Sequence, residues 1–271
     1  MNNPKISIII PTYKPQTYIW ECLDSLRNQT FAKDKFEVII VLNGCRNPWK
    51  CQIEDYIANK MQGMNVNFIH TEQGGVSNAR NLALDLVKGE YVTFIDDDDF
   101  VSPSYLEELY VKASPDTISL CYPYAFEDGK QMKQLKYEKT NVFEKYSQKK
   151  NIILNSKVRK FFSGPCMKLI PMSFIHERRY DVKFNIGEDA LFMFLISDKI
   201  EKINFTSSRA TYYRRFRECS ALTSKRSRWN KIKNSLRMIK SYSTIYFSSP
   251  FTYSFIFYAT RIMGSIKSMM R

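Results

Sequence analysis

The sequence lacks the paired cysteines that are typical of disulfide-rich, zinc-binding or thiol-redox proteins. Its six cysteines are scattered over 271 residues without the short paired spacings that such sites require. We also expect no secretory signal peptide, because residues 1–5 run directly into a short apolar stretch at residues 6–10. Internal repeats, low-complexity tracts and a set of transmembrane segments are absent too. We therefore expect a cytoplasmic protein with reduced thiols.

What the sequence does contain is enough apolar material for one well-buried domain, at 44% hydrophobic residues. Its positive charge is unevenly placed. Of 41 lysines and arginines, 14 lie in residues 209–271 beside a single acid, Glu218, whereas residues 1–208 are nearly neutral. This asymmetry indicates two different roles, and we expect a domain over residues 1–220 followed by a basic helical extension over residues 221–271.

Apolar, β-rich runs alternate with helical patterns, which is typical of a mostly parallel sheet covered on both faces. The predicted strands lie at residues 6–10, 37–42, 66–70, 91–95 and 117–122. The predicted helices lie at residues 76–86, 105–111 and 190–200, with another before residue 37 whose apolar side is Ile19, Cys22, Leu23 and Leu26. Residues 123–158 are polar and rich in lysine, so we expect hairpins or a mobile loop there.

Four consecutive aspartates, Asp96 to Asp99, follow the predicted strand at residues 91–95. Adjacent carboxylates repel one another unless a cation lies among them, and ligands bind at the carboxyl ends of strands in open α/β sheets. Hard divalent cations prefer oxygen ligands, and Mg²⁺ is usually held by one or two carboxylates and substrate phosphates. The run therefore predicts a metal–diphosphate site. The alternative is a solvated acidic turn that caps the next helix.

Several motifs, taken in order, resemble the family 2 glycosyltransferases, which are inverting enzymes with the GT-A fold. The resemblance covers about residues 6–220 and implies an α/β fold with a Rossmann-like nucleotide-binding half and an acceptor half. The motifs are Ile10-Pro11-Thr12-Tyr13, residues 75–81, Gly89-Glu90-Tyr91 leading to residues 94–99, Lys168-Leu169, Gly187-Glu188-Asp189 with Phe192, and Tyr212-Tyr213-Arg214.

Residue by residue, the resemblance implies a donor site at the aspartate run. Asp96 contacts the ribose, and Asp97 lies beside the nucleotide. Asp98 ligates the Mn²⁺ or Mg²⁺ that bridges the diphosphate, where the cation stabilises the charge that develops on the leaving group. Arg80 is expected near the nucleotide, with a solvated helix charge as the alternative.

The same resemblance places the nucleobase pocket at the ends of the first two strands. Thr12 and Tyr13 line this pocket, unless they only form a turn before Pro15. Asn43 stands where the family usually has an acid that reads the nucleobase. Its amide oxygen can accept the N–H of uracil, but its amino group can also donate, so a UDP-sugar is a weaker expectation than an acid would give. The alternative for Asn43-Gly44 is a turn.

Asp189 is the candidate general base, because an inverting transfer needs one carboxylate to take the proton of the acceptor hydroxyl. The alternative for Glu188 and Asp189 is ordinary acidic charge at a helix N-terminus. The resemblance implies that Glu188 orients Asp189 or an acceptor hydroxyl. Tyr213, Arg214 and Arg217 are expected to face the diphosphate or the acceptor, or else to form basic surface.

The basic extension predicts an amphipathic helix. Its apolar side consists of Trp229, Ile232, Leu236, Ile239, Tyr242 and Tyr246, and its basic side of Arg226, Lys233, Arg237 and Lys240. We expect residues 225–271 to make a peripheral contact with the inner face of the cell membrane, or alternatively to pack on the catalytic domain. Residues 225–229 lack the glutamine of the Gln-x-x-Arg-Trp signature of processive synthases, which favours single additions.

The sequence thus predicts transfer of a sugar from a UDP-sugar to a hydroxyl of a glycan or lipid-linked acceptor, typical of bacterial surface glycan synthesis. A sugar-nucleotide pyrophosphorylase is one alternative, although the first strand leads to Pro11 through Pro15 without the expected glycine-rich loop. The other is a non-enzymatic basic protein that binds membrane or nucleic acid. That alternative leaves the aspartates and Asp189 without a role, and we expect no nucleic-acid partner.

Overall fold

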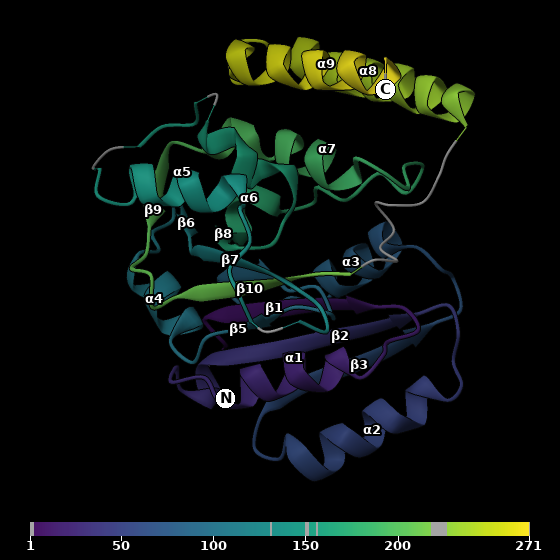
Figure 1. Ribbon diagram of the computed structural model, residues 1–271, viewed down its shortest axis with the longest axis vertical. Coiled ribbons are helices and arrows are strands. Elements are labelled where there is room, and N and C mark those ends of the chain that lie inside the picture. The colour runs from purple at the N-terminus through teal and green to yellow at the C-terminus, as the bar shows by residue number, and fades with distance from the viewer. Residues whose placement is uncertain (1–2, 131, 150–151, 156, 218–226, 271) are drawn as a thin grey trace.

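The computed structural model describes residues 3–130, 132–149, 152–155, 157–217 and 227–270. A seven-stranded sheet lies at the centre of this part of the chain, in the order β3-β2-β1-β4-β8-β6-β9 (Figure 1). Its strands are β1 (Ile6–Thr12), β2 (Phe36–Asn43), β3 (Asn65–Thr71), β4 (Tyr91–Phe94), β6 (Thr117–Leu120), β8 (Lys168–Pro171) and β9 (Lys202–Phe205). β1 to β4 pair in parallel and β8 is antiparallel to both its neighbours, so the predicted mostly parallel sheet is confirmed.

Helices cover both faces of the β1–β3 region, with α1 and α2 on one side and α3 on the other (Figure 1). These helices and the next along the chain are α1 (Tyr18–Arg27), α2 (Trp49–Lys60), α3 (Val76–Leu84) and α4 (Tyr105–Val111), and the short 3₁₀ turn η1 (Lys33–Lys35) precedes β2. The four residues predicted on the apolar side of α1 are fully buried. The sequence pattern missed α2 because that helix buries a single residue, Ile53.

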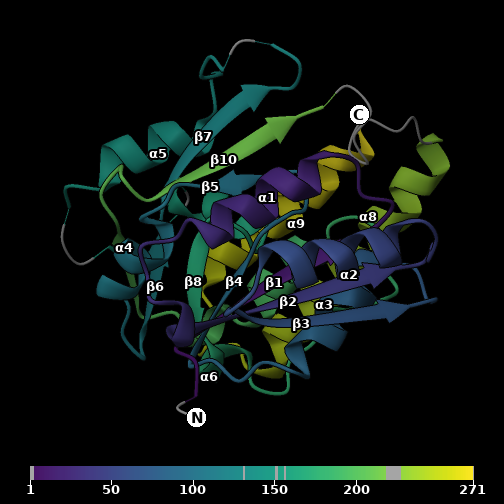
Figure 2. The ribbon, with the colours of Figure 1, turned by 90° about the horizontal axis from the view of Figure 1, so that it is seen from below.

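A second, three-stranded sheet lies beside the first in the order β5-β10-β7 (Figure 2). Its strands are β5 (Phe100–Val101), β7 (Tyr122–Glu127) and β10 (Thr211–Phe216). The expectation of hairpins or a loop at residues 123–158 is wrong in part, because this region contains most of β7 and the helix α5 (Glu138–Tyr146). The described residues between these two elements, 128–130 and 132–137, do lie outside helices and strands. β7 pairs with a strand nearly ninety residues later, which a local pattern does not reveal. The predicted strand at residues 117–122 ends at Leu120 because Tyr122 already belongs to this second sheet.

The remaining elements of the domain are η2 (Val158–Ser163), α6 (Met172–Ile175), α7 (Glu188–Leu195) and η3 (Ser197–Lys199). The helix predicted at residues 190–200 begins two residues earlier, so Glu188 and Asp189 form its first turn. Gly187 precedes it with φ 83°, a left-handed conformation that favours glycine. A Cβ at Gly187 would also come within 3.0 Å of Met238, which lies on the helix α8 (Arg228–Ser248).

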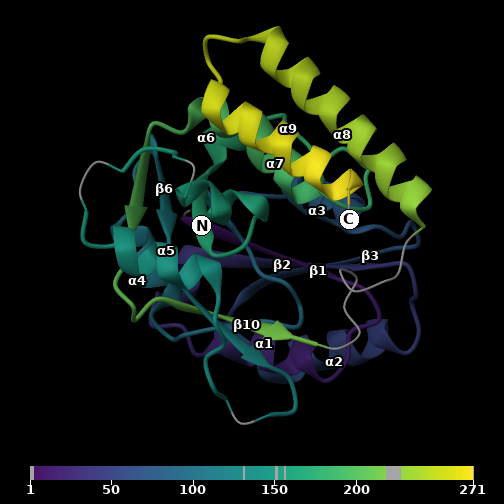
Figure 3. The same cartoon turned by 45° about the horizontal axis from the view of Figure 1, so that its top comes forward.

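The C-terminal region is a helical hairpin of α8 (Arg228–Ser248) and α9 (Phe255–Met269), which packs over α7 (Figure 3). Tyr242, Tyr253 and Phe257 form ring contacts with Phe194 of α7. The side chain of Arg261 is buried as well and donates a hydrogen bond to the carbonyl of Phe162. One face of the hairpin therefore belongs to the core of the domain.

The apolar side predicted for α8 does not face one environment. Tyr242 is 2% exposed and points into the domain, whereas Trp229 and Leu236 are 73% and 56% exposed. That part of the prediction is wrong, because α8 is covered by α7 on one flank and by α9 on another. Residues 225 and 226 and the domain boundary predicted at residue 220 lie outside the described residues. Within the described part of the chain, none of the helices has both the length and the apolar character that crossing a bilayer requires.

Candidate active site

The aspartate run follows directly from β4, and its side chains lie in different environments. Ile95 continues the strand by donating its N–H to Ile9, and the N–H of Asp96 donates to the hydroxyl of Tyr212 at 3.1 Å. Thr12 donates its hydroxyl to Asp97. Burial, together with the neighbouring carboxylates, raises the pKa of the Asp97 side chain to about 7. The run is therefore partly enclosed at the edge of the sheet and is not a fully solvated turn.

Arginines of β10 and of the residue after it hold the other two carboxylates. The backbone N–H of Arg215 donates to buried Asp99 at 2.7 Å, and its guanidinium donates to the carbonyl of Asp98 at 2.9 Å. Arg217 forms an ion pair with the carboxylate of Asp98. Burial and the charge of Asp96 raise the pKa of Asp98, while Arg217 opposes the shift. A cationic side chain thus lies beside the carboxylate that was predicted to hold a metal.

Arg80 joins two of the predicted site residues. Its guanidinium, on α3, lies 2.6 Å from Oδ1 of Asp189 and 3.3 Å from Oδ1 of Asp96, and also over the ring of Tyr180. The side chain is 4% exposed, which does not fit the alternative of a solvated helix charge. Burial alone would lower the pKa of Arg80. The neighbouring carboxylates, Asp189 first among them, raise it by more than burial lowers it, so the guanidinium stays charged.

Asp189 and Asp96 line one cavity of about 740 Å³. Asp189 lies in the first turn of α7, where the free N–H groups and the helix dipole favour a negative charge. Burial raises the pKa of its carboxyl, and the Arg80 guanidinium opposes this rise. The neighbouring Glu188 is also mostly buried, and its Oε2 has no hydrogen-bond partner among the described residues. Two carboxylates of different environment therefore lie at one helix end.

The residues predicted for the nucleobase pocket lie together at the ends of β1 and β2. Asn43 is 3% exposed, and its amide donates to the carbonyl of Thr12 at 2.8 Å and accepts from the N–H of Gly75 at 3.0 Å. Asn43 thus ties two strand ends to the loop before α3, a role that the sequence reasoning did not foresee. Tyr13 is 55% exposed and its ring covers Gly44, where a Cβ would come within 2.8 Å of it. The Lys14 ammonium lies 5.4 Å from the centre of this ring, and an exposed aromatic ring is suited to stacking on a base.

A metal ion at this site would need ligands from the substrate. Among the residues that the structure describes, no cluster of three or more His, Cys, Asp or Glu side chains is arranged to hold one. The donor set fits a hard cation of the kind that binds one or two carboxylates and completes its shell with phosphate oxygens and water. Asp98, which already attracts the cationic Arg217, is the carboxylate best suited to that role.

Two buried lysines near Asp189 were not assigned a role from the sequence. Lys168 of β8 is fully buried and donates to the carbonyls of Gly164 and Cys166 at 2.6 and 2.7 Å. Burial and the charge of nearby Lys139 together lower its pKa to about 7. Lys139, in the first turn of α5, lines the cavity of Asp189. The lysine-rich composition of this stretch gave no signal that one of its lysines would be buried.

Comparison with known proteins places the chain in a family. A family model for glycosyl transferase family 2 matches residues 7–178, which is more than half of the chain. A putative glycosyltransferase of Bacillus subtilis, EpsH, is 38% identical over 135 residues, which is 49% of this chain and 38% of EpsH. The poly(ribitol-phosphate) beta-N-acetylglucosaminyltransferase TarS of Staphylococcus aureus is 38% identical over 104 residues, or 38% of this chain and 18% of TarS. The chain thus matches less than half the length of these relatives.

Solved structures agree with the GT-A fold expected from the sequence. TarS residues 1–349 with UDP-GlcNAc superpose with a TM-score of 0.74 at 23% identity, covering 97% of this chain and 72% of that one. The mannosyltransferase PcManGT of Pyrobaculum calidifontis, in complex with GDP-Man and Mn²⁺, superposes with a TM-score of 0.60 at 14% identity, covering 100% and 74%. At these identities the likeness establishes the fold alone.

Proposed function

The chain belongs to glycosyl transferase family 2, and on that basis we propose that it is an inverting, metal-dependent glycosyltransferase. It transfers one sugar at a time from a nucleotide-diphosphate donor, a UDP-sugar, to a hydroxyl of a glycan or lipid-linked acceptor of the cell envelope. The observation that carries the proposal is the Arg80 guanidinium, which bridges Asp189 and Asp96 at the wall of one cavity. A base and a donor-binding carboxylate are thereby held at a fixed separation.

Asp189 acts as the general base in this proposal. Its carboxylate takes the proton of the acceptor hydroxyl while that oxygen attacks the anomeric carbon from the side opposite the diphosphate. Arg80 is a positioning residue that fixes the orientation of the carboxylate and keeps it ionised when the site is closed to water. Asp189 lies outside residues 7–178, so its role rests on this geometry and on the sequence motif.

Asp96, Asp97 and Asp98 bind the donor, with Thr12, Tyr13 and Asn43 around the nucleobase. Asp98 would hold Mn²⁺ or Mg²⁺, which, when bound, stabilises the negative charge of the departing nucleoside diphosphate. Arg217 pairs with Asp98, and this cation can turn to the diphosphate when the donor enters. The known complex of PcManGT with Mn²⁺ supports metal use in this fold.

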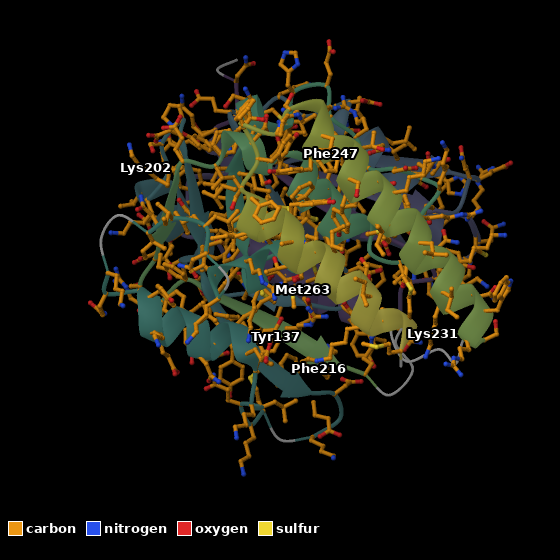
Figure 4. All side chains as sticks on the ribbon, turned by 90° about the horizontal axis from the view of Figure 1, so that it is seen from above. Tyr137, Lys202, Phe216, Lys231, Phe247 and Met263 are labelled. Atoms are coloured by element: carbon orange, nitrogen blue, oxygen red, sulfur yellow. The ribbon has the colours of Figure 1, made fainter. Side chains whose placement is uncertain are left out.

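The hairpin of α8 and α9 would attach the enzyme to the inner face of the membrane, as part of an extension that begins near residue 221. Its outward side exposes a set of large apolar residues, Trp229, Leu236, Phe247, Phe251, Phe255, Ile256, Met263, Ile266 and Met270. Figure 4, which views the molecule from the hairpin side, labels Phe247 on α8 and Met263 on α9. Lysines and arginines of α8 accompany this surface, and a bilayer with anionic headgroups matches both features.

Release of nucleoside diphosphate tests the proposed function. The full chain is mixed with Mn²⁺ and single UDP-sugars, and UDP is measured with and without glycan acceptors. Acceptor-dependent release of UDP is expected for at least one donor. Consumption of a nucleoside triphosphate and a sugar 1-phosphate with release of pyrophosphate would identify a pyrophosphorylase instead. Absence of both reactions across all donor nucleotides, together with liposome binding, would favour the non-enzymatic alternative.

A further inference from the structure

The cavity beside Asp189 contains cations that no carboxylate contacts directly. Its lining includes four cations, Lys136, Lys139, Lys160 and Arg214. The four carboxylates that line it already have partners. Asp96 and Asp189 bind Arg80, Glu138 binds Lys160, and Asp99 accepts from the backbone of Arg215. Within the described residues, Lys136, Lys139 and Arg214 are left without a carboxylate in ion-pair contact.

Among these cations, Lys139 gives the strongest indication of an anionic ligand because its side chain is buried. It is 8% exposed, and the nearest polar contact of its Nζ is the sulfur of Met167 at 3.7 Å. The rings of Tyr137 and Phe161 lie about 6 Å from the same nitrogen. Sulfur and aromatic rings offset only part of the desolvation cost of a buried ammonium, because neither carries the full negative charge of a carboxylate or phosphate. Its natural counter-ion is therefore a ligand.

The backbone around Lys139 favours an anion too. Lys139 lies in the first turn of α5, a nine-residue helix whose residues 136–139 line the cavity. Its N-cap residue, Tyr137, makes no side-chain capping hydrogen bond, so the first N–H groups of the helix remain available. Arg214 approaches from β10 and donates to the hydroxyl of Tyr137 at 3.4 Å. Figure 4 places Tyr137 beside Phe216 of β10, on the side of α9 away from α8.

The position of these cations distinguishes the acceptor from the donor diphosphate. The lining of this cavity contains Asp189, the proposed base that acts on the acceptor hydroxyl, and Asp96, which is proposed to contact the donor ribose. It does not contain Asp98, the residue proposed to hold the diphosphate metal, or the nucleobase residues Thr12, Tyr13 and Asn43. Asp98 has a cation of its own in Arg217. An anion bound by Lys139 therefore lies on the side from which the acceptor approaches.

We propose that the acceptor carries a phosphate, which is bound by Lys139, Arg214 and the first turn of α5 while a neighbouring hydroxyl reaches Asp189. The chemical class is a phosphate-bearing polyol or glycan. This inference rests on the proposed function, since it takes Asp189 as the base. It agrees with the name of one relative, the S. aureus enzyme, which acts on poly(ribitol-phosphate).

Calorimetry on the full chain tests the phosphate site without requiring turnover. The probes are ribitol 5-phosphate and ribitol, which differ only in the phosphate. Ribitol 5-phosphate should bind saturably and at least about tenfold more tightly than ribitol, as one charge-assisted contact supplies about 1.5–3 kcal/mol. Lys139→Met should lose this preference, and Lys145→Met, on the exposed far end of the same helix, should keep it. Equal binding of the two probes by the wild type would overturn the proposal.

A second experiment tests whether Lys139 and Arg214 bind the acceptor or the donor. Lys139→Met and Arg214→Gln should bind UDP with Mn²⁺ as the wild type does. A matching loss of UDP affinity would place these cations on the donor diphosphate and overturn the proposal. So would a selective loss of UDP-glucuronic acid relative to UDP-glucose, because the anion would then be a donor carboxylate. Lys139→Met should fold normally, since an apolar side chain of similar length removes a buried charge, and its melting temperature verifies this.

The proposed function can fail independently of this site. If no UDP-sugar is turned over but ribitol 5-phosphate still binds through Lys139, the phosphate site stands and the transferase assignment falls. If UDP is released with neutral acceptors and the phosphate gives no advantage in binding or in KM, the transferase assignment stands and the phosphate site falls. The two results therefore separate the two claims.

Discussion

The two halves of the catalytic region treat buried charge differently. In the donor half, from β1 to the aspartate run, each buried ionic group has a partner, as in the pairs of Arg80 with Asp189 and of Thr12 with Asp97. In the acceptor half, Lys139 and Lys168 are buried with only sulfur or carbonyl contacts. Because unpaired buried charge is costly, this contrast indicates a donor half whose buried charges are balanced within the protein and an acceptor half whose buried cations need a ligand.

The largest expected effect lies at the junction of the two halves. Asp189→Asn removes the base but keeps the shape of the side chain, so transfer should fall by about two orders of magnitude or more while UDP binding persists. Initial rates of UDP release with acceptor, and calorimetry with UDP, measure the two quantities. Asp85→Asn, an exposed carboxylate paired with Arg179, is the matched control and should be silent. A variant at Asp189 that transfers at nearly the wild-type rate would remove this residue from the mechanism.

The next prediction concerns the donor half alone. Asp98→Ala should abolish the metal-dependent share of UDP affinity, a loss of more than about tenfold or 1.4 kcal/mol, because the carboxylate and diphosphate share one cation. The measurement is UDP titration with Mn²⁺ and with chelator. The variant should bind ribitol 5-phosphate normally, which keeps the two halves distinct. Metal-dependent UDP binding that survives the substitution would show that another group holds the cation.

The third prediction concerns the buried Lys168 of the acceptor half and the pH dependence of the free energy of unfolding. Burial lowers the pKa of Lys168 to about 7, and the charge of Lys139 acts in the same direction, whereas Cys166, Cys121 and Asp189 oppose it. Between pH 7 and the ordinary lysine value of 10.5, the unfolded chain binds more protons at this group than the folded one. Its contribution to the free energy of unfolding therefore rises with pH in that window, by at most about 1.4 kcal/mol per unit.

Lys168→Met should remove that rise. Urea unfolding at pH 7 and at pH 9 would show a smaller gain in stability for the variant than for the wild type. Lys145→Met, which changes an exposed lysine, should retain the full gain. Equal pH slopes in all three proteins would mean that Lys168 stays protonated in the folded state.

A smaller effect is expected at Asn43, whose buried amide has hydrogen-bond partners within the donor half. Asn43→Asp loses the donor to the Thr12 carbonyl and sets a buried carboxylate against that oxygen, so stability should fall by about 1–3 kcal/mol. Thermal unfolding measures it, with Asn59→Asp on the exposed side of α2 as control. If UDP then competes better against GDP, Asn43 also contacts the base, as its position in the sequence motif predicts. Unchanged stability would show that the bonds to Thr12 and Gly75 contribute little.

Local and long-range contacts explain which parts of the fold and of the candidate site could be predicted from the sequence. Strands β1 to β4, helix α1 and the aspartate run follow from apolar periodicity and from motifs that are local in sequence. β7 and α5 did not, because β7 pairs with distant β10 and α5 buries little apolar surface. The enclosure of Asn43 and of Lys139 depends on contacts between segments far apart in the chain. Apolar periodicity predicts which face of a helix or strand a residue lies on. The side chains that it contacts depend on how distant segments pack together.

The C-terminal hairpin divides apolar residues between two environments, and a pair of substitutions can separate them. Phe251, at the turn, is fully exposed, whereas Tyr253 is 9% exposed, stacks on Phe194 and donates to the carbonyl of Leu195 at 3.0 Å. Phe251→Ser should leave the melting temperature unchanged and weaken binding to anionic liposomes by about 1 kcal/mol, since a side chain at the interface gains part of its full burial energy. Tyr253→Ser should lower the melting temperature and leave the binding to anionic liposomes unchanged.

Sedimentation with liposomes at 0.1 M and at 1 M salt measures the partitioning of both folded variants. The wild type should lose binding at high salt, because about 1 kcal/mol per basic residue near the surface is screened there. The Phe251→Ser deficit should persist at both salt concentrations, since the burial of an apolar ring does not depend on charge. If Phe251→Ser partitions like the wild type at both, the outer face of the hairpin does not enter the bilayer. Its apolar residues would then need a different partner, while the inner face would still hold the hairpin on α7.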